Sequence, residues 1–123
     1  HGYPKTVNDL NKHNFISFGR GAPSPVYNPD WALKLGMKDS KKRKTAMRVN
    51  SVYGLLLAVQ SGVGLAAIPD YLTVKQPNIA KVLPSVQGPT TEAHFVYPQS
   101  LKNVARVQAF RNFLYSKISE WEF

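Results

Sequence analysis

Polar residues that can bind an anion lie where a predicted strand ends and a predicted helix begins. The strand-like segment ends at Val49, and Asn50, Ser51 and Tyr53 follow at the start of an apolar helix. The free N–H groups and the dipole of a helix N-terminus favour a carboxylate, and ligands of open α/β sheets sit outside the carboxyl ends of strands. Asn and Ser are also ordinary helix caps, and Tyr53 can serve packing alone, so both roles stay open.

A second group with this placement is Ser17-Phe18-Gly19-Arg20, where another predicted strand ends. An arginine at this point can hold a carboxylate through two hydrogen bonds. Arginines are also common at protein surfaces, and from the residues alone an exposed arginine on a loop is the favoured interpretation.

The reactive side chains argue against an enzyme. The chain has no cysteine and no serine in a nucleophile-elbow pattern, and His1, His13 and His94 lack the spacing of metal ligands. Gly62 and Gly64 follow a predicted helix and precede a predicted strand, the reverse of the order in a dinucleotide-binding loop. We therefore expect no catalytic residue, no metal and no cofactor.

The predicted elements that position the anion-binding residues begin with a short helix over residues 6–13, which places Leu10 inward. A strand over the apolar residues 15–18 follows. Glycines and prolines make residues 19–29 an exposed loop. Asp30 is then placed to cap a short helix.

The clearest unit is a strand, a helix and a second strand within residues 45–68. An alternating segment ends at Val49, apolar residues at helical spacing cover residues 52–59, and Gly62 is the left-handed terminator. The apolar surface of this helix exceeds one stripe, so we expect both of its sides to be covered. Residues 64–68 complete a right-handed parallel crossover, which makes the fold class α/β.

Two more strands and a long helix complete the predicted elements. The strands cover residues 79–83 and 93–97, and the amphipathic helix runs from residue 104 to about residue 120. We expect an apolar stripe of this helix to be core, and it consists of Val107, Phe110, Leu114, Ile118 and Trp121.

The charge balance makes a polyanion the first partner to consider. The chain has 16 Lys and Arg against 7 Asp and Glu, a formal net charge of +9. Only one dense cluster occurs, made of Lys38, Lys41, Lys42, Arg43 and Lys44. A strand-like segment follows it rather than a recognition helix, so a solvated loop is the favoured interpretation and a polyanion contact the alternative.

Composition indicates one domain or part of a larger one, since 123 residues with 43% hydrophobic content can bury a core. No apolar run is long enough for a membrane helix, and the first residues are too polar for a signal peptide. The lack of cysteine fits a reducing compartment, so we expect a cytoplasmic protein without a membrane partner.

Several runs of residues resemble the effector-binding domain of LysR-type bacterial transcriptional regulators. The most specific are Val49-Asn50-Ser51, Gly62-Val63-Gly64-Leu65-Ala66 and Ile68-Pro69-Asp70-Tyr71-Leu72. The preceding runs Pro4-Lys5-Thr6, Asp9-Leu10 and His13-Asn14-Phe15-Ile16 also match, although Val7-Asn8 stands where proline is common. The family's last strands and helix are similar to Val82-Leu83-Pro84, Phe95-Val96-Tyr97-Pro98, Ala109-Phe110 and Phe113-Leu114. Essentially the whole chain is covered, and within the family it resembles the subgroup named LsrB.

The resemblance implies a fold similar to a type 2 periplasmic binding protein, with two α/β subdomains and the effector between them. Residues 1–92 would be the second subdomain, and residues 93–123 the crossover strand and C-terminal helix that return to the first. The winged helix-turn-helix has no counterpart in this chain. The apolar stripe of the last helix would then need cover from the missing N-terminal part of the regulator or another copy of the chain.

The resemblance also implies a function without catalysis. A small anionic effector would bind between the subdomains and change the DNA binding of a full-length homodimer or homotetramer, which contacts DNA only through the helix-turn-helix. Half of the pocket would come from the first subdomain. The implied effector-binding residues are Ser17, Phe18, Gly19, Arg20, Asn50, Ser51, Tyr53 and Pro69.

Two other functions remain open. A fragment of a solute-binding protein for transport would share the architecture and carry a secretion signal upstream. A basic nucleic-acid-binding module would bind random duplex DNA with an affinity that falls steeply with salt.

Overall fold

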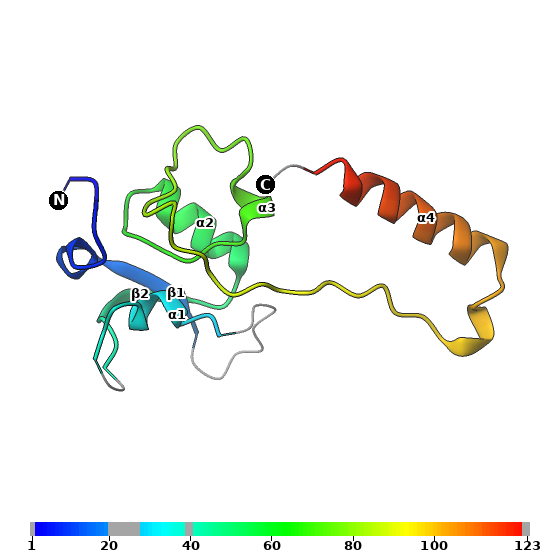
Figure 1. Cartoon of the computed structure of the whole chain (residues 1–123), viewed down its shortest axis with the longest axis horizontal. Helices are drawn as coiled ribbons and strands as arrows, with labels where there is room; N and C mark the ends of the chain where they lie inside the picture. Colours follow the sequence, from blue (N-terminus) through cyan, green and yellow to red (C-terminus); the bar gives the residue numbers. More distant parts are fainter. Residues whose placement is uncertain (1, 20–27, 39–40, 122–123) are drawn as a thin grey trace. The chain divides into compact units, whose positions relative to one another are not determined.

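The computed structural model describes residues 2–19, 28–38 and 41–121. The chain divides into two compact units, His1–Thr91 and Glu92–Phe123, and each is described by itself (Figure 1). Most of the predicted glycine- and proline-rich loop lies outside the described residues. Both groups of predicted anion-binding residues belong to the first unit.

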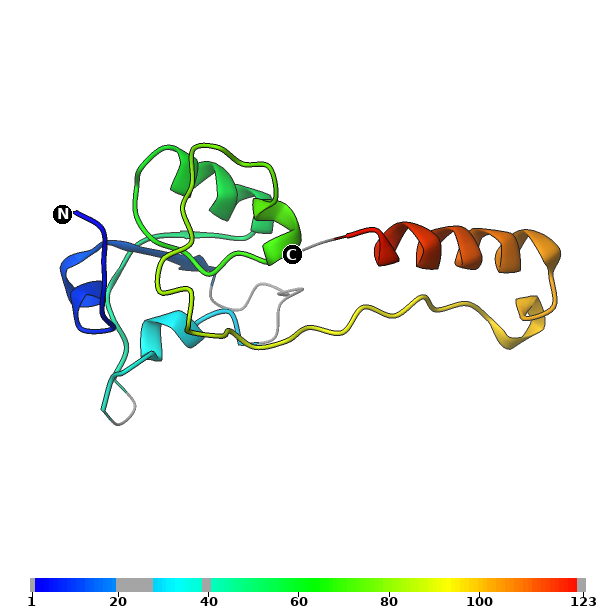
Figure 2. The ribbon, with the colours of Figure 1, turned by 45° about the horizontal axis from the view of Figure 1, so that its top comes forward.

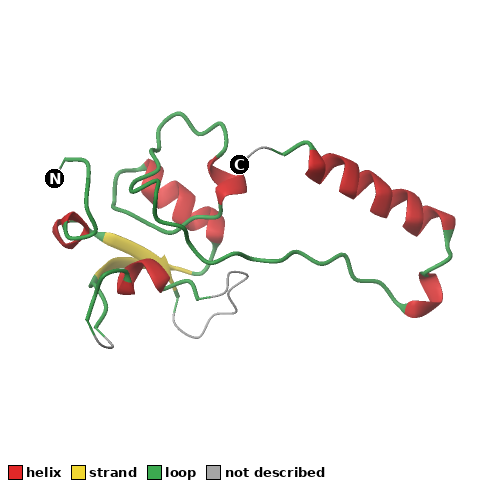
Figure 3. Ribbon diagram, in the orientation of Figure 1, coloured by secondary structure: helices red, strands yellow, loops and turns green. Residues whose placement is uncertain are grey.

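A two-stranded parallel sheet forms the centre of the first unit (Figure 3). Its strands are β1 (Phe15–Phe18) and β2 (Thr45–Val49), paired so that Phe18 lies beside Val49. All four side chains of β1 are buried, as in a strand that is covered on both faces. These two predicted strands are confirmed.

The predicted strand over residues 64–68 contributes only one bridge. Leu65 pairs in parallel with Phe15, and the N–H of Ile16 donates to the Leu65 carbonyl oxygen at 2.8 Å. The N–H of Leu65 donates in turn to the carbonyl oxygen of Asn14 at 2.9 Å. The order of strand, helix and strand is correct, but its last member is much shorter than predicted.

Helix α2 (Val52–Gln60) joins β2 to this bridge, as predicted. It ends before Gly62, whose φ of +74° is the left-handed conformation that glycine adopts without strain. Its buried side chains are Leu55, Leu56 and Ala58. The prediction that both sides of this helix are covered is wrong, because Leu57 is 48% exposed.

Two apolar cores lie on opposite faces of β1. Figures 1 and 2 show α2 on one side of the strands and α1 (Trp31–Lys34) on the other. The core under α2 contains Ile16, Phe18, Leu55 and Ala58. The opposite core contains Leu10, Phe15, Leu33 and Leu83, and Leu10 comes from the short 3-10 helix η1 (Asp9–Lys12) that forms within the predicted helix over residues 6–13.

Arg43 belongs to the basic cluster in sequence but is only 8% exposed, so the prediction of a wholly solvated loop is wrong for this residue. Its Nε donates to the side-chain oxygen of Asn11 at 2.8 Å. Nη1 donates to the carbonyl oxygens of Ala32 and Leu35 at 3.2 and 2.7 Å, and Nη2 to that of Val7 at 3.2 Å. The guanidinium therefore ties the η1 region to α1.

The strands predicted over residues 79–83 and 93–97 do not form. Their β-forming residues depend on a neighbouring strand that offers free backbone groups. In the first segment Leu83 instead turns its side chain into a core and is 9% exposed. In the second, the ring of Phe95 packs edge-on against Phe110 at a centroid distance of 5.7 Å.

The second unit contains η2 (Gln99–Leu101) and the predicted long helix, α4 (Ala105–Ser119). No residue of α4 is buried, and Phe110 and Ile118 are 52% and 47% exposed. The stripe is therefore not core within this unit, and its cover by another part of the regulator or another copy stays a prediction. No helix in the described ranges is both long and apolar enough to cross a bilayer.

Candidate functional site

The carboxyl ends of β1 and β2 meet at one edge of the sheet. Because the strands are parallel and Phe18 pairs with Val49, Gly19 and Asn50 follow at the same edge. The N–H of Gly19 donates to the Val49 carbonyl oxygen at 2.7 Å, which extends the pairing by one residue. The structure thus brings together the ends of the two strands that carry the predicted site residues.

Helix α2 begins at this edge. Ser51 is its N-cap, and the Ser51 hydroxyl oxygen accepts a hydrogen bond from the N–H of Gly54 at 3.4 Å. The N–H groups of Val52 and Tyr53 belong to the first turn, where no intrahelical acceptor exists. Asn50 and Ser51 are exposed, and the side chain of Tyr53 is 60% exposed rather than packed in the interior.

The side chains of Ser17 and Phe18 lie in the interior, each 3% exposed. The hydroxyl of Ser17 donates to the carboxylate of Asp30 at 2.5 Å, and Phe18 packs in the core under α2. The Phe18 carbonyl oxygen accepts from Nη1 of Arg48 at 2.6 Å. Both residues therefore support the edge from within, and neither offers an exposed side chain there.

The other two predicted site residues are placed differently. Arg20 lies outside the described residues. Pro69 is the N-cap of the short helix α3 (Asp70–Thr73), and the preceding Ile68 packs against the same core as Phe18.

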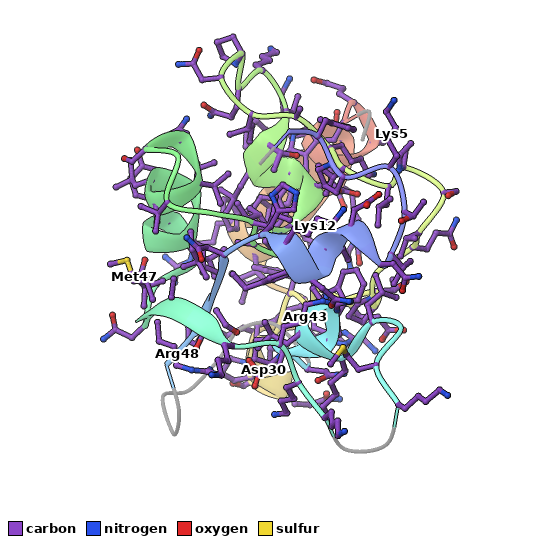
Figure 4. The ribbon with its side chains drawn as sticks, turned by 90° about the vertical axis from the view of Figure 1, so that its left-hand side faces the viewer. Lys5, Lys12, Asp30, Arg43, Met47 and Arg48 are labelled. Atoms are coloured by element: carbon purple, nitrogen blue, oxygen red, sulfur yellow. The ribbon has the colours of Figure 1, made fainter. Side chains whose placement is uncertain are left out.

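Asp30 is the charged residue of this region that the sequence interpretation missed (Figure 4). It was expected to cap α1, but its side chain makes no capping hydrogen bond. Its carboxylate instead accepts from Ser17, lies 3.0 Å from Nζ of Lys42 and 3.3 Å from Nη1 of Arg48. The available signal was that Asp30 is the sole acidic residue between Asp9 and Asp39.

Partial burial of Asp30 acts to raise the pKa of its carboxyl group, but its partners outweigh that effect. Hydrogen bonds from Ser17, Lys42 and Arg48, with the charge of Arg48, lower the pKa from 3.8 to about 2. Asp30 therefore stays ionised and holds β1, β2 and the basic segment together.

We expect the variant Asp30→Asn to lose a pH-dependent part of the stability. A carboxyl group whose pKa falls from 3.8 to about 2 on folding stabilises the folded state above pH 3.8, and the contribution disappears as the pH falls through about 2. The shift corresponds to about 2 kcal/mol. Thermal unfolding should show wild type clearly above the variant at about pH 5 and nearly equal to it at about pH 2.

The control is Asp70→Asn, which removes a carboxylate that is 58% exposed and 3.7 Å from Lys81. It should keep the pH dependence of the wild type. Parallel acid profiles for wild type and Asp30→Asn would contradict the role given to Asp30.

The remaining His, Asp and Glu side chains among the described residues do not form a metal-binding cluster. His94 lies 3.5 Å from Glu92, and both side chains are largely exposed. Among the described residues no group of three or more His, Asp and Glu side chains is placed to hold a metal ion.

Comparison with known protein families identifies a match. The family model of the LysR substrate binding domain matches residues 1–118. The match covers nearly the whole chain but assigns no subgroup, so membership in the LsrB subgroup stays a prediction. Searches of curated proteins and of solved structures found no match.

Proposed function

The chain belongs to the LysR substrate binding domain family, and on this basis we propose that it senses a small anion for a bacterial transcriptional regulator. Domains of this family are periplasmic-binding-protein-like and bind effectors in LysR-type regulators, where their role is regulatory rather than catalytic. The mixed α/β structure with a small parallel sheet agrees with part of such a domain. Such a regulator would act in the cytoplasm.

The proposed effector site is the sheet edge where β1 and β2 end. The observation that carries it is that Gly19 and the exposed start of α2 meet there, joined by the hydrogen bond from Gly19 to Val49. An anion at this point would accept hydrogen bonds from the first amides of α2 and interact favourably with the helix dipole. Asn50, Ser51 and Tyr53 are the exposed side chains placed to contact it.

Ser17 and Phe18 have a supporting role in this proposal. Their side chains fix the position of Gly19 through Asp30 and through the core, and Phe18 is further held by Arg48. Arg20 directly follows Gly19, and Pro69 begins α3. We retain both as effector-contact residues of the proposal.

We assign residues 1–92 to the second subdomain and residues 93–123 to the part that returns to the first. An effector that binds between two subdomains shifts the population of their relative orientations by its differential affinity for them. In a dimeric or tetrameric regulator this shift would move the DNA-binding ends. The exposed side chains of α4, such as Phe110, would be covered by the rest of the regulator or another copy.

Replacing Ser51 with alanine is expected to weaken anion binding. The change removes the cap of α2 and one polar contact, which costs about 1 kcal/mol of stability. In ¹H–¹⁵N titrations with succinate or phosphate, the apparent Kd of the folded variant should rise about fivefold, the factor that loss of one hydrogen bond of about 1 kcal/mol produces.

The matched control is Ser61→Ala at the other end of the same helix, where the hydroxyl donates to the Leu57 carbonyl oxygen at 2.9 Å. Its anion affinity should stay at the wild-type value. Equal losses in the two variants would mean that stability rather than the site is being measured, and unchanged affinity in Ser51→Ala would contradict the proposed contact.

A further inference from the structure

The positive charge of the chain is concentrated in the first unit. Residues 1–91 contain twelve of the Lys and Arg residues but only four of the acidic ones. Half of those cations lie in the short segment from Lys34 to Lys44. The charge excess therefore belongs to one segment and its neighbours rather than to the chain as a whole.

Two hollows adjoin this segment and share Arg43 and Lys44. The first, of about 360 Å³, is lined by Asn11, Lys12, His13, Asn14, Met37, Arg43 and Lys44. The second, of about 390 Å³, is lined by Lys42, Arg43, Lys44, Thr45 and Arg48. We call the two together the basic groove, and its lining carries no acidic residue.

The basic side chains in and beside the groove differ in their hydrogen-bond and ion-pair partners within the protein. Arg43 is buried, and its N–H groups donate to Asn11 and to backbone carbonyl oxygens. Lys42 and Arg48 share the carboxylate of Asp30. Lys44 is exposed, as is Lys41 just outside the lining, and neither has a carboxylate partner among the described residues.

The arrangement suits a chain of phosphates better than one small anion. Tight binding of a small anion requires hydrogen-bond donors that converge in a closed pocket. This groove is open, and the basic groups without a carboxylate partner are lysine ammonium groups on flexible side chains. Such point charges along an open surface match a linear array of backbone phosphates, whose binding is driven by counterion release. Duplex nucleic acid is the polyanion that a transcriptional regulator approaches.

We propose that the basic groove contacts the phosphate backbone of duplex DNA, above all through Lys44 in its lining and through Lys41, which precedes the lining residue Lys42 in the sequence. The contact is independent of the sequence of the DNA, and it adds affinity to whatever base-specific contacts the regulator makes elsewhere. The choice of DNA rests on the proposed regulatory function. Lys41 and Lys44 are not among the residues assigned to the effector edge, so the two assignments can be tested separately.

The test is fluorescence anisotropy of the 123-residue chain with a random-sequence duplex of about 20 base pairs at several salt concentrations. The chain should bind measurably at about 50 mM salt, and the affinity should fall linearly on a log–log plot. The variant Lys41→Gln with Lys44→Gln should bind about tenfold or more weakly, with the salt slope reduced by about 2. Both substitutions are at exposed positions, so the variant should fold.

The charge-matched control is Lys75→Gln with Lys102→Gln, two exposed lysines outside both the groove lining and the basic segment from Lys34 to Lys44. It should keep most of the affinity and the wild-type salt slope. Equal weakening in the two double variants would overturn the proposal, because net charge alone would then account for binding. The absence of any binding at low salt would overturn it as well.

Discussion

Replacing Arg43 with leucine is expected to lower the free energy of unfolding by about 3 kcal/mol, enough to unfold much of a marginal domain. Arg43 is 8% exposed, and its guanidinium donates to the carbonyl oxygens of Val7, Ala32 and Leu35. Leucine can fill the space beside Phe15, over whose ring the guanidinium carbon lies 5.7 Å from the centroid. It cannot donate to those oxygens, and buried acceptors without partners are costly.

Lysine at this position should recover little of the loss. Its ammonium is a single centre and cannot replace the planar fork that reaches both Val7 and Leu35. Urea unfolding followed by far-UV circular dichroism measures the effect, and the exposed Lys44→Leu is the control within the same segment. Wild-type stability of Arg43→Leu would show that the guanidinium does not hold η1 and α1 together.

Gly64→Ala is the second substitution with a large expected effect. A Cβ at this position would lie 2.4 Å from the carbonyl oxygen of Asn14 and 2.9 Å from its carbonyl carbon. Both atoms are backbone, and the same oxygen accepts from the N–H of Leu65 at 2.9 Å. The neighbour can move only if the bridge between Leu65 and Phe15 is broken, so we expect a loss of about 3 kcal/mol.

Gly54→Ala is the matched control, since its Cβ would meet Val49 and Ser51 at ordinary contact distances of 3.5 to 3.6 Å. Gly54 lies within α2, where alanine is favoured over glycine by up to about 1 kcal/mol. The two glycine variants should therefore shift the midpoint of urea unfolding in opposite directions. A neutral Gly64→Ala would mean that the backbone of Asn14 is not held as described.

Local patterns predicted the centre of the first unit well. The apolar run at β1 and the helical spacing of α2 are patterns that can be recognised within a few residues, and Ser51 and Gly62 mark the helix ends by their own chemistry. The meeting of Gly19 with Asn50 followed from the rule that parallel strands end at one edge.

Interactions between distant residues could not be predicted in the same way. Asp30 was expected to act within α1, but its partners Ser17 and Arg48 are 13 and 18 residues away in sequence. Arg43 looked like one member of a solvated cluster, and nothing local indicates that three carbonyl oxygens face it. Such contacts depend on how whole elements pack.

The false strands have a related cause. Residues 79–83 and 93–97 have the composition of strands, but strand formation requires a neighbour with unpaired backbone groups. Exposure of the α4 stripe likewise depends on what surrounds the helix and not on its periodicity.

The central claim is that the edge formed by β1, β2 and α2 binds a small anion. The most direct test is an assigned ¹H–¹⁵N titration of the ¹⁵N-labelled chain with succinate and, separately, with inorganic phosphate. We expect saturable shift changes that are largest at the amides of Ser51, Val52 and Tyr53, with a smaller change at Gly19. Changes confined to the basic groove around Lys44, or none that saturate, would contradict the assignment of the effector site to this edge.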